Sequence, residues 1–141
     1  RYLRYDIQAD KDSMFNTPPV FPIYMLGKVL KWMRDQGGVE AMERQAEDKA
    51  GILYRAIDQS SGYYRCPVDV NSRSVMNVVF RLPTEDLEKT FLSGADAAGL
   101  LNLKGHRSVG GIRASIYNAL PKEGVQALAT FMSEFQSAHP A

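Results

Sequence analysis

The chain has 141 residues, which is enough for one domain of ordinary size or for a piece of a larger protein. Apolar residues make up 45% of it and charged residues 23%, with a formal net charge of +1, as in a soluble globular protein. The interleaved, nearly cancelling charges exclude the basic surface of a nucleic-acid-binding protein, and no apolar run reaches the roughly 20 residues that span a membrane.

Cysteine and histidine are scarce. Cys66 is the only cysteine, so an intrachain disulfide is impossible and a reducing, cytoplasmic compartment is expected. His106 and His139 are far apart in the sequence, so no metal site is predicted. The chain opens on Arg1 rather than on Met, as a fragment or a trimmed product would.

The first third of the chain predicts two helices separated by a glycine pair. Residues 1–13 are expected to be extended. Thr17 has the residue type of an N-cap, and Pro18 opens a helix that runs to about residue 36. Apolar residues widen this helix's buried face, so burial on more than one side is expected. The glycines at 37–38 end it, and a second helix follows over about 39–59.

The hydrophobic period then changes from helical to alternating. Four alternating segments are predicted to be short strands: 63–68, 76–82, 101–103 and 112–117. Pro67 places the first of them at a sheet edge. Helices are predicted between Thr84 and Gly99 and over the apolar stripe 125–135. This order predicts an α+β fold, in which a small antiparallel or mixed sheet carries helices on one face.

The stretch 104–118 carries the strongest functional signal. Glycines flank the adjacent His106 and Arg107, and Arg113 follows in the middle of a predicted strand. A guanidinium offers two parallel hydrogen bonds to a carboxylate or a phosphate, and an imidazole can also donate to such groups. The stretch therefore predicts recognition of a small molecule that carries two negative groups.

Each of these residues also has a purely structural interpretation. His106 and Arg107 fit a solvated turn, and Arg113 fits an ordinary exposed arginine on the outer face of a strand. Asn16-Thr17, at a predicted helix start, suits a phosphate because free backbone N–H groups lie there, but both residues are also common caps.

The residues themselves supply no catalytic group. Most of the lysines are expected on solvent-facing helix surfaces, and none in an apolar setting that would lower its pKa for Schiff-base chemistry. Cys66 precedes a proline and is expected to pack rather than to react. From the residues alone, no function beyond the binding of a doubly anionic small molecule can be inferred.

Several segments together resemble the carboxyl-terminal part of the phosphoserine aminotransferases: Asn16–Pro19, Trp32, Gly37-Gly38, Asn71–Asn77 and Lys104–Asn118. The resemblance covers essentially the whole chain, and the block from Gly105 to Ser115 is specific to that family among aminotransferases. It implies a fold-type-I enzyme that uses pyridoxal 5′-phosphate. In that reaction glutamate donates its amino group to 3-phosphohydroxypyruvate, which yields O-phosphoserine and 2-oxoglutarate. Members often also serve pyridoxine biosynthesis.

The resemblance also implies roles for single residues. Arg113 would bind the substrate α-carboxylate, and His106 and Arg107 would form part of the site for its phosphate or side-chain carboxylate. Asn16 and Thr17 would reach the cofactor phosphate of the neighbouring subunit, because the family forms homodimers with active sites at the subunit interface.

The resemblance further implies a domain boundary and a missing part. Residues 1–42 would end the large cofactor domain, which explains the unusually apolar first helix, and residues 43–141 would form the small domain. The family's Schiff-base lysine lies upstream and has no counterpart in this sequence. The chain is therefore expected to be inactive alone. Two alternatives stay open: a non-catalytic binding module for a small phosphorylated acid, and a folded chain without ligand function.

Overall fold

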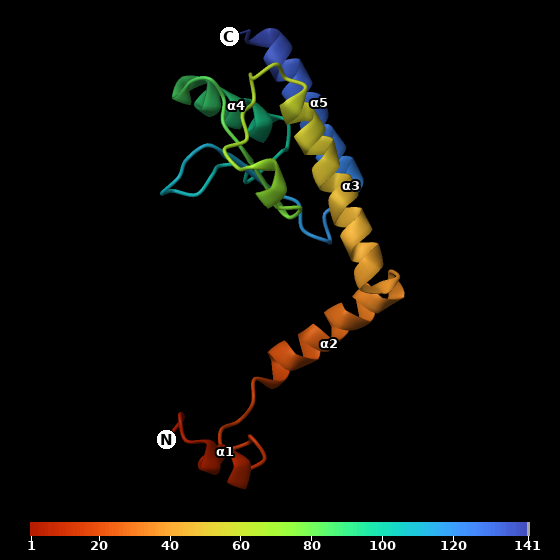
Figure 1. The fold of residues 1–141 in the computed structure, drawn as a ribbon, viewed down its shortest axis with the longest axis vertical. Helices are drawn as coiled ribbons and strands as arrows, with labels where there is room; N and C mark the ends of the chain where they lie inside the picture. The colour runs from red at the N-terminus through yellow and green to blue at the C-terminus, as the bar shows by residue number, and fades with distance from the viewer. Residues whose placement is uncertain (141) are drawn as a thin grey trace. The chain divides into compact units, whose positions relative to one another are not determined.

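The computed structural model describes residues 1–140, which fall into two units, residues 1–41 and residues 42 onwards (Figure 1). The elements are, in chain order, α1 (Tyr5–Asp10), α2 (Val20–Asp35), α3 (Gly38–Asp58), the 3-10 turn η1 (Val70–Ser72), β1 (Asn77–Phe80), α4 (Glu85–Ala97), β2 (Ile112–Ser115) and α5 (Lys122–Ala138). Helices beside a small antiparallel sheet confirm the predicted α+β class. Within the described residues, no helix has the length and apolarity needed to span a membrane.

The first unit differs from the sequence prediction in two places. Residues 5–10 form the short helix α1 rather than an extended segment, and Asp6 lies near its positive amino-terminal end. Thr17 is not an N-cap. Helix α2 begins at Val20, two residues after the predicted start at Pro18, and Pro19 occupies the N-cap position. A residue before proline avoids helical backbone angles, so Pro18, which precedes Pro19, cannot open the helix.

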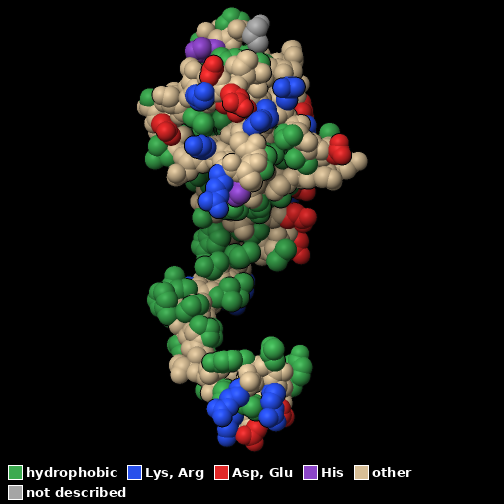
Figure 2. Space-filling view, turned by 90° about the vertical axis from the view of Figure 1, so that its left-hand side faces the viewer, with side chains coloured by type: hydrophobic (Ala, Val, Ile, Leu, Met, Phe, Trp, Pro, Cys, Tyr) green, Lys and Arg blue, Asp and Glu red, His purple; other side chains and the backbone are tan. Residues whose placement is uncertain are grey.

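Helix α2 presents its apolar side chains to solvent. None of its residues is buried, and its large apolar side chains, from Val20 to Trp32, are 40–71% exposed. Figure 2 shows hydrophobic side chains gathered on the surface of this unit. The expectation of burial on more than one side is therefore wrong for the described residues, because the first unit contains no second layer against which α2 could pack.

The second unit is built around the two-stranded antiparallel sheet. Val78 pairs with Ala114 and Phe80 with Ile112, and all four side chains point into the core. Side chains from α3, α4 and α5 complete this core, so the helices cover one face of the sheet as predicted. The opposite face carries the alternate residues of both strands and is only partly covered.

Two of the four predicted strands shrink to single bridges. Residues 63–68 pair with the sheet only at Arg65, opposite Arg81, because Pro67 removes a backbone donor. In the segment 101–103, Asn102 has a positive φ of 62°, which interrupts an extended strand, and pairing is confined to the bridge between Lys104 and Ile112.

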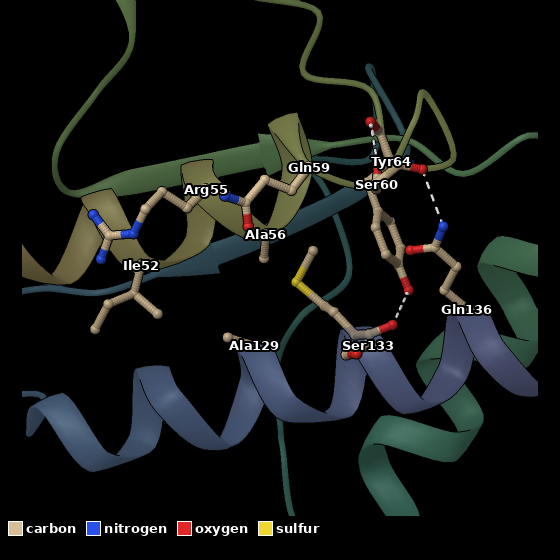
Figure 3. Close-up of a pocket in the computed structure, with 10 residues that line it drawn as sticks. Ile52, Arg55, Ala56, Gln59, Ser60, Tyr64, Ala129, Ser133 and Gln136 are labelled. Atoms are coloured by element: carbon tan, nitrogen blue, oxygen red, sulfur yellow. Dashed lines mark hydrogen bonds between the residues drawn. The ribbon is translucent and has the colours of Figure 1, made fainter.

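Tyr64 joins this core to α5 through a buried phenol. Its hydroxyl donates to the Met132 carbonyl oxygen at 2.8 Å (Figure 3). Burial raises the pKa of Tyr64 far above the usual 10, and burial also raises the pKa of Tyr54 and of Tyr63. The unfolded chain releases these protons near pH 10 while the folded chain keeps them, so the free energy of unfolding must fall as the pH rises above 10.

Replacing Tyr64 by Phe should flatten this pH dependence. We expect Tyr64→Phe to cost about 1 kcal/mol at neutral pH through the lost hydrogen bond, and to reduce the decline by up to ~1.4 kcal/mol per pH unit above pH 10. Urea unfolding at about pH 8, 10 and 11 measures both effects. Tyr5→Phe is the control, since folding leaves that side chain exposed. An unchanged slope in Tyr64→Phe contradicts the prediction.

Candidate functional site

The stretch singled out in the sequence folds as one hairpin that leads into β2. Lys104 bridges Ile112, the Gly105 N–H donates to the Gly111 carbonyl oxygen at 2.8 Å, and the Arg113 N–H donates to the Leu103 carbonyl oxygen at 2.7 Å. Arg113 therefore lies in one arm of the hairpin. His106 and Arg107 lie in its loop, about 10 Å further along the strand direction at ~3.3 Å per residue.

The loop is closed by hydrogen bonds to its own backbone. The carbonyl oxygen of His106 accepts the N–H groups of Val109, at 2.9 Å, and of Gly110, at 2.7 Å. Gly110 has a positive φ of 74°, which a side chain would disfavour. This turn leaves the side chains of His106 and Arg107 exposed, as a ligand-binding pair must be.

The hydrogen bonds of His106 fix which ring nitrogen can donate. The Ser108 backbone N–H donates to Nδ1 at 3.3 Å, and the Ser108 hydroxyl lies 2.7 Å from the same nitrogen. In the neutral ring this assigns the proton to Nε2, which is then a donor for an anion. Arg107 makes no ion pair within residues 1–140, so its guanidinium is free for the same purpose.

Arg113 lies on the partly covered face of the sheet, opposite Val79 of β1. Its side chain is half-buried, and its Nε is buried without a hydrogen-bond partner in the described part of the chain. A buried guanidinium N–H without an acceptor is costly, so this atom can take an acceptor that the described residues do not supply. The ordinary exposed arginine of the structural interpretation does not describe it.

A polar cluster continues the same face beyond Arg113. The Asn77 carboxamide oxygen accepts the Ser115 hydroxyl at 3.0 Å and the Tyr117 hydroxyl at 3.4 Å. Ser115 and Tyr117 share the face of Arg113, as their alternation predicts. The sequence did not identify Asn77 as a candidate site residue, because only the strand register, which pairs Asn77 with Ser115, brings it to this face of the sheet.

Lys49 corrects the prediction about the lysines. Its side chain is buried, with 4% of the residue exposed, and burial lowers the pKa of its ammonium group. The ammonium donates to the carbonyl oxygens of Tyr117, at 2.7 Å, and Leu120, at 3.0 Å. Lys49 thus holds the turn that follows β2 against α3. The sequence could have predicted this burial, because Lys49 lies among the apolar residues of the buried face of α3.

Asn16 and Thr17 belong to the other unit, in the loop before α2. Both side chains are exposed, and α2 receives no side-chain cap from either of them. Their amide and hydroxyl donors are therefore open. Such donors beside a helix start suit a phosphate group, which fits the cofactor role expected for them.

A groove of the second unit lies away from the hairpin. It measures about 450 Å³ between α3 and α5, and polar residues such as Arg55, Gln59 and Ser133 line it together with Tyr64 (Figure 3). None of the predicted site residues reaches it. Nor do three or more His, Cys, Asp or Glu side chains gather into a possible metal site anywhere in residues 1–140.

Comparison with known proteins relates the whole chain to one group of enzymes. Residues 2–128 match the family described as aminotransferase class-V. The phosphoserine aminotransferases of Laribacter hongkongensis (strain HLHK9) and Lysinibacillus sphaericus (strain C3-41) are 63% and 54% identical to this chain, over 96% and 97% of its length. In both cases the chain spans 38% of the relative's length.

Solved structures give the same result. The phosphoserine aminotransferase from Bacillus circulans subsp. alkalophilus superimposes with a TM-score of 0.89 at 52% identity, over 96% of this chain and 38% of that one. The PLP-bound phosphoserine aminotransferase from Trichomonas vaginalis superimposes with a TM-score of 0.82 at 39% identity, over 92% of this chain and 37% of that one.

Proposed function

The chain belongs to the class-V aminotransferase family, and on this premise we propose that it is the carboxyl-terminal part of a phosphoserine aminotransferase. The full-length protein would transfer the amino group of glutamate to 3-phosphohydroxypyruvate, giving O-phosphoserine and 2-oxoglutarate, for serine biosynthesis and also for pyridoxine biosynthesis. The hairpin of residues 103–113 carries the proposal, since it combines a half-buried arginine with an exposed His-Arg pair.

The charges of the hairpin match the charges of such a substrate. No Asp or Glu occurs between Asp96 and Glu123, so no neighbouring carboxylate in this segment competes for its guanidinium groups. Arg113, with its unpartnered Nε, would bind the α-carboxylate. His106 and Arg107 would bind the phosphate, or the side-chain carboxylate of glutamate, at the other end of the molecule.

The cofactor proposed is pyridoxal 5′-phosphate. When bound, it supplies the electron sink for amino-group transfer. From this chain, Asn16 and Thr17 would hold its phosphate through their open donors, in the neighbouring subunit of a cytoplasmic homodimer. Residues 1–42 would then belong to the large cofactor domain and residues 43–141 to the small one. The bare apolar surface of α2 supports this assignment, because such a helix requires cover from elsewhere.

The proposed reaction can be tested on the full-length protein that contains this chain. With added pyridoxal 5′-phosphate, the protein should acquire a visible absorption band and should convert glutamate and 3-phosphohydroxypyruvate into 2-oxoglutarate and O-phosphoserine. The 141-residue chain alone should do neither. A full-length protein that forms no O-phosphoserine at saturating substrates would end the proposal.

One observation favours a second candidate, a binding module for a phosphorylated acid. All the hairpin's anion-binding groups lie within the second unit. Calorimetry with O-phosphoserine on the 141-residue chain decides between the two. Measurable binding without the rest of the protein favours the module, and no heat at millimolar ligand excludes it.

Arg107→Ala should change substrate selectivity. We expect kcat/KM of the full-length protein to fall about 10- to 100-fold for 3-phosphohydroxypyruvate, because a charge-assisted hydrogen bond to phosphate is lost. For hydroxypyruvate, which lacks the phosphate, the loss should stay within about threefold. Steady-state kinetics with both substrates measure the ratio. Equal losses for the two substrates contradict the assignment of Arg107.

A further inference from the structure

We propose that Arg81 is a positioning residue that tethers the loop of His106 and Arg107 to the end of β1. The proposal rests on the proposed function in that this loop binds the substrate phosphate. The Arg81 backbone is itself fixed, since its N–H and C=O pair with the C=O and N–H of Arg65 at 2.9 and 3.0 Å. From this anchored position its guanidinium Nη1 donates to the Val109 carbonyl oxygen at 3.1 Å.

This hydrogen bond reaches His106 through one further residue. Val109, which accepts from Arg81 through its carbonyl oxygen, donates its own N–H to the His106 carbonyl oxygen at 2.9 Å. The peptide units on both sides of Val109 are therefore held, one by Arg81 and one by His106. An exposed loop tip would otherwise be mobile, and each alternative position would move the imidazole away from a bound anion.

The two glycines of the loop are fitted to the Arg81 side chain. A Cβ atom at Gly110 would lie 2.7 Å from Arg81 Nη1, and one at Gly111 would lie 2.6 Å from Arg81 Cδ. Both glycines also have positive φ angles, of 74° and 72°. Arg81 therefore packs directly against the backbone of the loop. The glycine pair therefore does more than allow the bend, because the absence of Cβ atoms also leaves room for the Arg81 side chain.

Glu88 of α4 holds the other edge of the guanidinium. Its Oε1 lies 3.4 Å from Arg81 Nε, and the residue is only 9% exposed. Glu88 also accepts the Leu82 N–H at 3.4 Å. Arg81 thus forms an ion pair with Glu88 through Nε and donates a hydrogen bond to the loop through Nη1. A lysine has a single nitrogen and cannot make both contacts with this geometry.

The test compares Arg81→Met with Arg65→Met in the full-length protein. Both variants remove one positive charge, but the Arg65 side chain is exposed, and the hydrogen bonds of Arg65 to Arg81 are made by its backbone. Hydrogen exchange followed by mass spectrometry should show faster exchange of residues 105–111 in Arg81→Met, by about tenfold, with α3 and α5 unchanged. Arg65→Met should resemble the wild type. Glu88→Gln should act in the same direction as Arg81→Met, but more weakly.

Kinetics provide the second readout. In Arg81→Met, the preference for 3-phosphohydroxypyruvate over hydroxypyruvate, as a ratio of kcat/KM values, should fall about tenfold, mainly through KM of the phosphorylated substrate. Arg81→Lys should recover part of the ratio. Unchanged exchange of the loop, or faster exchange throughout the second unit, overturns the proposal. If the wild type does not transaminate, the proposed function falls, while loop exchange still decides whether Arg81 tethers the loop.

Discussion

Replacing Arg113 by Lys in the full-length protein is expected to lower kcat/KM for both substrates about 10- to 100-fold, or ~1.5–3 kcal/mol of transition-state binding. Both substrates carry an α-carboxylate, so both should suffer. The lysine keeps the positive charge but cannot make the two parallel hydrogen bonds of a guanidinium. It also removes Nε, the buried donor that has no partner among residues 1–140. Steady-state kinetics with glutamate and with 3-phosphohydroxypyruvate measure the loss.

Controls separate binding from folding in this experiment. Arg44→Lys makes the same chemical change at an exposed position of α3 and should leave kcat/KM unaltered. The melting temperature of Arg113→Lys should stay close to that of the wild type, because the side chain makes no ion pair within the described chain. A loss confined to one of the two substrates argues against an α-carboxylate role. A wild-type kcat/KM for both removes Arg113 from the site.

Phe91→Ala is expected to produce the largest change in stability, about 3–5 kcal/mol off the free energy of unfolding of the second unit. Phe91 is 0% exposed, at the centre of the core. Its ring makes edge-on contacts with four other aromatic rings, with centroid distances of 5.1–6.1 Å: Tyr64, Phe80, Phe131 and Phe135. Truncation to alanine leaves a cavity and removes all four contacts.

Circular dichroism during urea unfolding is the appropriate measurement. The only tryptophan, Trp32, lies in the first unit, so its fluorescence would report on the wrong part of the chain. Phe91→Leu, which keeps most of the volume, should cost about 1–2 kcal/mol. Thr90→Ala, at the exposed neighbouring position of α4, should cost less than ~1 kcal/mol. A Phe91→Ala loss as small as that of Thr90→Ala would show that the core tolerates the cavity.

The sequence determined the elements whose pattern is local and strong. The apolar stripe of residues 125–135 predicts α5, and the alternation over 76–82 and 112–117 predicts β1 and β2. The α+β class and the family resemblance follow from such local information. Where two local preferences competed, the prediction failed. At Pro18-Pro19 the restriction before a proline outweighed the capping preference of Thr17, and in residues 101–103 a positive φ at Asn102 interrupted the strand.

The sequence also placed the candidate site residues in one hairpin, with His106 and Arg107 in its loop and Arg113 in one arm. It could not supply their surroundings, because those come from residues distant along the chain. Register brings Asn77 beside Ser115, packing buries the Lys49 ammonium against the turn after β2, and the bridge to Arg65 directs Arg81 under the glycine loop. Periodicity along a chain reports which side of an element is buried. Only tertiary structure decides which groups then meet, and here it decides how the loop of His106 and Arg107 is held.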